Sequence, residues 1–124
     1  MAIILLATGD TTAYDIFSAE ISGEGHELVW AIDGQEAYDL ALENMPDLAL
    51  LDLSLPIFNA FETCELLRND PDFPPHLPVF ILTDEDLSAK QLEGARATGA
   101  FPKTHLAQEL RDVLVDHLGP KAGG

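Results

Sequence analysis

Residues 48–56 (LALLDLSLP) constrain the fold of this chain more than any other stretch. Four apolar residues run without a break into Asp52, and a loop stiffened by proline follows at once. A short, unbroken apolar run of this kind is typical of a strand that is buried on both faces, as in parallel sheets. Asp52 then lies at the carboxyl end of the strand, where open α/β sheets place their ligands. By position alone, Asp52 could also merely cap a turn ahead of Pro56.

Short apolar runs alternate with helix-like segments along the whole chain. The runs lie at residues 3–7, 28–31, 48–52, 79–82 and 100–101. Between and after them, apolar residues recur at helical spacing, with the last two helices predicted over residues 87–97 and 106–118. Because strands alternate with helices five times, we expect a parallel sheet with helices on both faces.

Local patterns refine three of these helices. Asp33 is placed to cap the second helix, with Glu36 three residues on, and Pro46 stops that helix. Cys64, in the third helix, is expected to be a small core residue. The apolar residues that recur at helical spacing in the first helix are Ala13, Ile16, Phe17 and Ile21.

Composition restricts the class of protein. At 124 residues, of which 47% are apolar, the chain is long enough for one domain with a proper core. No apolar run approaches the ~20 residues that span a bilayer, and no basic region precedes an apolar core as in an export signal. The single cysteine excludes an internal disulfide and agrees with a reducing compartment. We therefore expect a cytoplasmic protein with no membrane partner.

The net charge of −16 is extreme, with 6 basic against 22 acidic residues. Such a chain repels a phosphate backbone, so nucleic acid is excluded as a direct partner. Proteins with basic surfaces are favoured instead. Solubility or a high-salt habitat would account for the same charge equally well.

One edge of the predicted sheet collects the residues that could carry chemistry. Asp10, Asp52, Thr83 and Lys103 each follow a different strand, and parallel strands end at a common edge. A carboxylate can attack phosphorus and form an acyl phosphate when the charge on the transferring group is neutralised. Taken singly, Thr83 could cap the next turn and Lys103 could be an ordinary surface lysine.

Several segments together resemble the receiver domain of bacterial two-component response regulators. They are AIDGQEA at residues 31–37, Pro46-Asp47 leading into LLDLSLP, LPVFILT at residues 77–83, and the late Gly99-Ala100 with Lys103. The resemblance covers residues 3–118. It implies a flavodoxin-like (βα)5 fold, a three-layer sandwich around a parallel sheet of strand order 2-1-3-4-5. The receiver-like domain would span residues 1–118, with residues 119–124 as a flexible tail.

The resemblance also implies roles for individual residues. Asp52 would be the phosphoacceptor, taking its phosphoryl group from a histidine kinase or phosphotransfer protein in a phosphorelay. Thr83 would be the hydroxyl that senses this group, and Lys103 the cationic anchor. Mg²⁺ would be held by Asp52 and the backbone carbonyl of Ser54. Phe101 is the nearest match to the aromatic switch residue, which acts together with Thr83.

The same resemblance implies how such a domain signals. At most it would phosphorylate and dephosphorylate itself at Asp52, with no independent enzyme activity. Without an output domain in this chain, a stand-alone receiver would signal by contact with a downstream target protein. The surface from about residue 87 to residue 118 is the expected contact face.

Three departures from the family pattern concern the metal site and its surroundings. Thr8-Gly9 stands where receivers carry two adjacent acids, and Asp10 follows as a tentative metal ligand. Asp84 occupies a position that is usually small, where its charge could oppose the acceptor or help a metal. The stretch from Gly99 to Lys103 is shorter than in the family.

These departures leave two alternatives open. The first is an atypical pseudo-receiver, a protein-binding module with the same fold that works without phosphorylation. The second belongs to another class of protein, because Thr8-Gly9-Asp10-Thr11 resembles the flavodoxin loop that binds the FMN phosphate at a helix N-terminus. Asp10 argues against FMN, since its charge would repel the phosphate.

Overall fold

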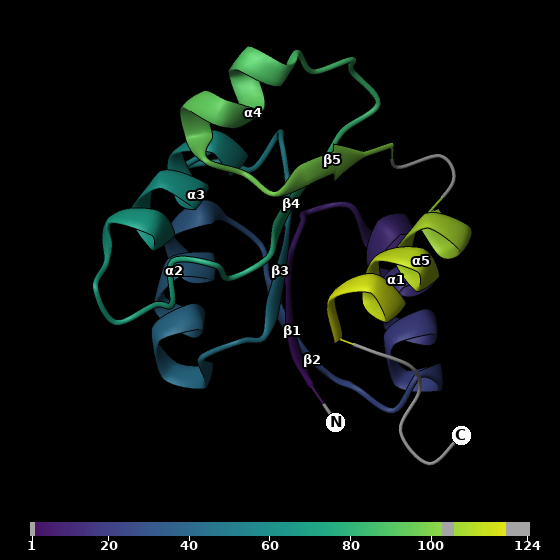
Figure 1. Cartoon of the computed structure of the whole chain (residues 1–124). Coiled ribbons are helices and arrows are strands. Elements are labelled where there is room, and N and C mark those ends of the chain that lie inside the picture. Colours follow the sequence, from purple (N-terminus) through teal and green to yellow (C-terminus); the bar gives the residue numbers. More distant parts are fainter. Residues whose placement is uncertain (1, 103–105, 119–124) are drawn as a thin grey trace.

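The protein is a three-layer α/β sandwich built on one sheet (Figure 1). The computed structural model describes residues 2–102 and 106–118. Its five strands are all parallel and lie in the order β2-β1-β3-β4-β5, so the predicted fold class and strand order are confirmed. The strands are β1 Ile3–Ala7, β2 Glu27–Ala31, β3 Leu48–Asp52, β4 Val79–Leu82 and β5 Gly99–Phe101.

Helices cover both faces of the sheet (Figure 1). Helices α1 and α5 pack together on one face, and α2, α3 and α4 lie on the other. The bounds are α1 Thr11–Gly23, α2 Gly34–Asn44, α3 Ala60–Asn69, α4 Ala89–Ala95 and α5 Leu106–Leu118. Among the described residues, none of these helices combines the length and the apolar character needed to cross a membrane.

The central strand β3 divides the hydrophobic core into two halves. All five of its residues are buried, and its side chains alternate between the faces because the period of a strand is two. Leu48 and Leu50 pack with α1 and α5, whereas Ala49 and Leu51 pack with α2 and α3. The unbroken apolar run therefore predicted correctly a strand buried on both faces. Cys64 is fully buried in the half of the core that contains Ala49 and Leu51, as expected.

The predicted helix caps are largely observed. The Asp33 carboxylate accepts a hydrogen bond of 2.7 Å from the Glu36 backbone N–H at the start of α2. Helix α2 ends at Asn44, and the next residue, Met45, adopts a left-handed φ of 47° immediately before Pro46. Helix α4 is shorter than the predicted 87–97, because Ser88 caps its start and Arg96 adopts a left-handed φ of 60° at its end. In α1 only part of the apolar stripe is covered, since the Ile16 side chain is 38% exposed.

A side-chain pair joins α2 to the connector that follows α3. The Tyr38 hydroxyl donates a short hydrogen bond to the Asp70 carboxylate. This bond is the main reason why the pKa of Tyr38 is raised, with burial adding to it. The same bond, followed by one from the Asp72 N–H, lowers the pKa of Asp70.

We expect the contribution of this pair to stability to depend on pH at both extremes. A lowered Asp70 pKa stabilises the fold above the pKa of the unfolded chain, and that contribution is lost as the pH falls through the folded pKa. A raised Tyr38 pKa contributes below the unfolded tyrosine pKa and is lost as the pH rises through the folded value. The free energy of unfolding in urea should therefore differ most between wild type and Tyr38→Phe at pH values between the folded pKa of Asp70 and the folded pKa of Tyr38. A difference that does not change with pH would contradict the assignment.

Candidate functional site

Asp52 is a buried carboxylate at the carboxyl end of the central strand. It is 4% exposed, and both of its oxygens accept hydrogen bonds. Oδ1 accepts from the backbone N–H of Ser54 at 3.1 Å and from the Ser54 hydroxyl at 2.9 Å, while Oδ2 accepts from the Thr8 hydroxyl at 2.8 Å. Asp52 thus caps a turn, and it also lies at the edge where the parallel strands end.

A pocket of about 370 Å³ opens beside this carboxylate. Thr83, which directly follows β4, contributes to the same pocket, is only 7% exposed and accepts a hydrogen bond of 3.0 Å from the Glu85 N–H. The structure therefore brings together three of the predicted site residues, Asp52, Ser54 and Thr83. The residues that line the pocket are Asp52, Leu53, Ser54, Thr83, Asp84 and Glu85.

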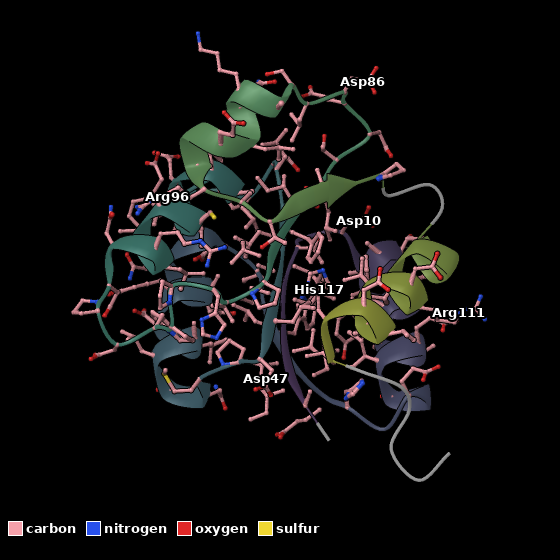
Figure 2. The ribbon with its side chains drawn as sticks, viewed as in Figure 1. Asp10, Asp47, Asp86, Arg96, Arg111 and His117 are labelled. Atoms are coloured by element: carbon pink, nitrogen blue, oxygen red, sulfur yellow. The ribbon has the colours of Figure 1, made fainter. Side chains whose placement is uncertain are left out.

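The far wall of this site is strongly acidic. Asp84, Glu85 and Asp86 form the loop between β4 and α4, and a second pocket of about 270 Å³ continues along it. Figure 2 shows Asp86 at the top of the molecule and Asp47 at the bottom. A negatively charged ligand that enters beside Asp52 meets the negative charges of this loop.

Thr8 belongs to the site through its hydrogen bond to Asp52, a contact that the sequence did not predict. Its side chain is fully buried directly after β1, and its hydroxyl also accepts a hydrogen bond of 3.0 Å from the Asp10 N–H. Its carbonyl accepts from the Trp30 indole N–H at 2.9 Å, and its N–H donates to the Ala31 carbonyl at 2.9 Å. Thr8 is thereby fixed at every polar atom.

Asp10, the tentative metal ligand, is the N-cap of α1. Its Oδ1 accepts hydrogen bonds from the backbone N–H groups of Thr12 at 2.9 Å and of Ala13 at 3.2 Å.

The backbone of Phe101, the predicted switch residue, pairs with Leu82 on β4. Lys103 lies outside the described residues, so its role as an anchor stays a prediction.

The donor set at this edge can be compared with what a magnesium ion requires. Mg²⁺ takes near-octahedral oxygen ligands, generally one or two carboxylates with several waters. Thr8 and Gly9 supply no carboxylate where the resemblance places two, and the Asp10 carboxylate caps a helix. Within the described part of the chain, no three or more His, Cys, Asp or Glu side chains form a group that could hold a metal ion. The described residues therefore lack the acidic pair of the expected magnesium site and leave Asp52 as the carboxylate that the resemblance assigns to the metal.

The fold and the site define a doubly wound α/β domain with a buried carboxylate at the carboxyl edge of its sheet. Comparison with known proteins identifies the family. The model of the response regulator receiver domain matches residues 4–115. Response regulator MprA of Mycobacterium sp. (strain KMS) is 32% identical over 109 residues, which are 86% of this chain and 46% of that protein.

Solved structures agree on the fold. Vibrio cholerae chemotaxis protein CheY4 has a TM-score of 0.86 at 24% identity, covering 94% of this chain and 98% of that one. The receiver domain of sensor histidine kinase PA1611 from Pseudomonas aeruginosa PAO1 has a TM-score of 0.84 at 21% identity, covering 95% and 98%. That structure has a magnesium ion coordinated in its active site cleft.

The chain therefore belongs to the response regulator receiver domains of two-component systems. Receiver domains generally interact with histidine kinases and downstream effectors and typically bind Mg²⁺. This membership confirms the resemblance to receiver domains and argues against the alternative of an FMN-binding flavodoxin-like protein. The chain spans about half the length of MprA, 46% of it.

Proposed function

We propose that Asp52 accepts a phosphoryl group from a histidine kinase or phosphotransfer protein, and that the domain passes the signal to a downstream protein by contact. The observation that supports this proposal most is the placement of Asp52. Its buried carboxylate and the Thr83 hydroxyl line one pocket at the edge of the sheet where ligands of such folds bind. The proposed domain spans residues 1–118, and the proposed contact face lies between residues 87 and 118.

The proposed step is a transfer between two proteins. One oxygen of the Asp52 carboxylate attacks the phosphorus of a phosphohistidine, the P–N bond breaks, and the histidine nitrogen keeps the electron pair. The product is an acyl phosphate on Asp52. The hydroxyls of Ser54 and Thr83 are close enough to the pocket to donate hydrogen bonds to the new phosphoryl oxygens. Lys103 is the proposed cationic group.

Small phosphodonors test the proposal without knowledge of the kinase. We expect acetyl phosphate or phosphoramidate to add the mass of one phosphoryl group, measured on the intact protein, with the incubation run both in Mg²⁺ and in EDTA. Asp52→Asn should abolish the gain. Asp47→Asn is the matched control, because Asp47 is an exposed carboxylate at the other end of the sheet (Figure 2). No gain under either condition, or a gain that persists in Asp52→Asn, would refute the proposal.

The acidic wall favours a second candidate, a pseudo-receiver that binds a protein partner without phosphorylation. Asp84 and Glu85 line the pocket beside Asp52, and two further like charges there oppose an incoming phosphoryl group. Under this alternative the partner contact would be the same in wild type and in Asp52→Asn, and no phosphodonor would label the protein. Stoichiometric labelling at Asp52 would remove it.

A further inference from the structure

We infer that the Thr8 hydroxyl takes the structural place of a divalent cation beside Asp52, so that this receiver holds its acceptor carboxylate without Mg²⁺. The part of the inference that concerns phosphoryl transfer rests on the proposed function. The part that concerns metal binding does not, because it follows from the hydrogen bonds among Thr8, Asp10 and Asp52.

The direction of the Thr8–Asp52 hydrogen bond is fixed. An ionised carboxylate can only accept, so at 2.8 Å the Thr8 hydroxyl must be the donor. The same hydroxyl oxygen accepts from the Asp10 N–H at 3.0 Å, which leaves its single proton for Asp52. A hydroxyl arranged in this way presents a proton, not a lone pair, toward the carboxylate. It therefore neutralises part of the charge on Oδ2 from the side on which receivers carry acids.

Thr8 cannot turn aside to admit a cation without breaking other bonds. Its side chain is fully buried, and its backbone groups bond to Trp30 and Ala31. The Trp30 ring in turn packs at a tilt against Tyr14, with ring centroids 4.2 Å apart. A cation on the Oδ2 lone pair that accepts from Thr8 would have to displace a hydroxyl that is held at every polar atom.

Asp10 does not supply the missing carboxylate in this arrangement. Its Oδ1 accepts two backbone N–H groups at the start of α1, groups that have no other partner within a helix. Its own N–H is the donor to Thr8. Moving the Asp10 carboxylate toward a metal would uncap α1 and disturb the bond that orients the Thr8 proton.

The metal part of the inference is tested by calorimetric titration of Mg²⁺ into the full chain, with the fluorescence of Trp30, the single tryptophan, as a second readout. We expect no saturable binding at millimolar Mg²⁺ in wild type. Thr8→Asp restores a carboxylate beside Asp52 and should gain saturable binding, which a further Asp52→Asn change should remove. Saturable binding by wild type that depends on Asp52 would overturn the inference, whether or not Thr8→Asp folds.

The rate part is tested with acetyl phosphate as the phosphodonor. Wild type should be labelled at Asp52 at similar rates in Mg²⁺ and in EDTA. Thr8→Val removes the hydrogen bond that positions the Asp52 carboxylate and should slow labelling by about tenfold or more, as expected when a reacting group is displaced, and Thr8→Ser should recover most of the rate. Thr63→Val is the matched control, because Thr63 is equally buried but its hydroxyl donates to the Phe58 carbonyl.

The two parts can fail separately. Labelling that requires Mg²⁺ would overturn the inference and leave the proposed function standing. If no condition labels wild type, the proposed function fails, and the titration still decides the metal part. A Thr8→Val rate equal to that of wild type would overturn the role of Thr8 as a positioning residue.

Discussion

Gly34→Ala is expected to destabilise this domain strongly. A Cβ at Gly34 would lie 2.1 Å from the Phe58 carbonyl oxygen and 2.6 Å from the Thr63 hydroxyl oxygen. The Gly34 N–H also donates to the Pro56 carbonyl at 3.1 Å, so the start of α2 rests on the loop that follows Asp52. Because a backbone atom has to move, we expect a loss of about 2–3 kcal/mol in the free energy of unfolding, toward the upper end of overpacking effects.

Denaturant unfolding of Gly34→Ala measures this loss, and Gly94→Ala is the control. Gly94 lies in α4, and a Cβ there would have no heavy atom within 4 Å. Alanine in a helix is more favourable than glycine by up to about 1 kcal/mol, so Gly94→Ala should be neutral or stabilising. Equal unfolding free energies for the two variants would show that α2 is not packed tightly against the loop at Phe58.

Arg68→Leu should also be costly, because one guanidinium links three segments. Arg68 lies in α3, and its Nε donates to the Arg96 carbonyl at 2.9 Å. One terminal nitrogen donates to the Leu77 carbonyl at 2.6 Å. A hydrogen bond from a charged donor contributes about 1.5–3 kcal/mol. Because the bond to Arg96 is exposed and the bond to Leu77 is partly buried, the variant should lose about 2–3 kcal/mol, mainly from the second bond. Hydrogen exchange should accelerate first in the connector at residues 70–78.

Arg111→Leu is the matched control for this change. Arg111 forms an ion pair with Glu20 at 3.5 Å, in which the two side chains are 49% and 27% exposed. Exposed ion pairs contribute about 0–1 kcal/mol, so this variant should unfold at nearly the wild-type denaturant concentration. If both arginine variants lose the same stability, Arg68 does not act as the link.

The sequence predicted the frame of this fold because its signals are local. Each buried strand is one apolar run, and the cap at Asp33 and the stop at Pro46 depend on neighbouring residues. The ends of α4 were less predictable, because Ser88 and Arg96 set them through backbone geometry. Ile57 adopts a φ of 70°, which a β-branched residue rarely does. No pattern in the sequence indicated that conformation.

The contacts within the site were harder to predict because they join distant segments. Thr8 and Asp52 are 44 positions apart, and only the register of β1 with β3, in which Ala7 pairs with Leu51, places them side by side. Asp10 follows a strand and precedes a helix, so its sequence position suits a metal ligand and a cap equally well. The observed hydrogen bonds to Thr12 and Ala13 show the cap.

An acyl phosphate on Asp52 can be trapped chemically and located in the chain. Borohydride reduces an acyl phosphate of aspartate to homoserine, which tandem mass spectrometry can locate in the chain. After treatment with acetyl phosphate, we expect homoserine at position 52 and none in the untreated protein. Phosphorylated protein with no homoserine at position 52, or with the phosphoryl group on another residue, would contradict the proposed role of Asp52.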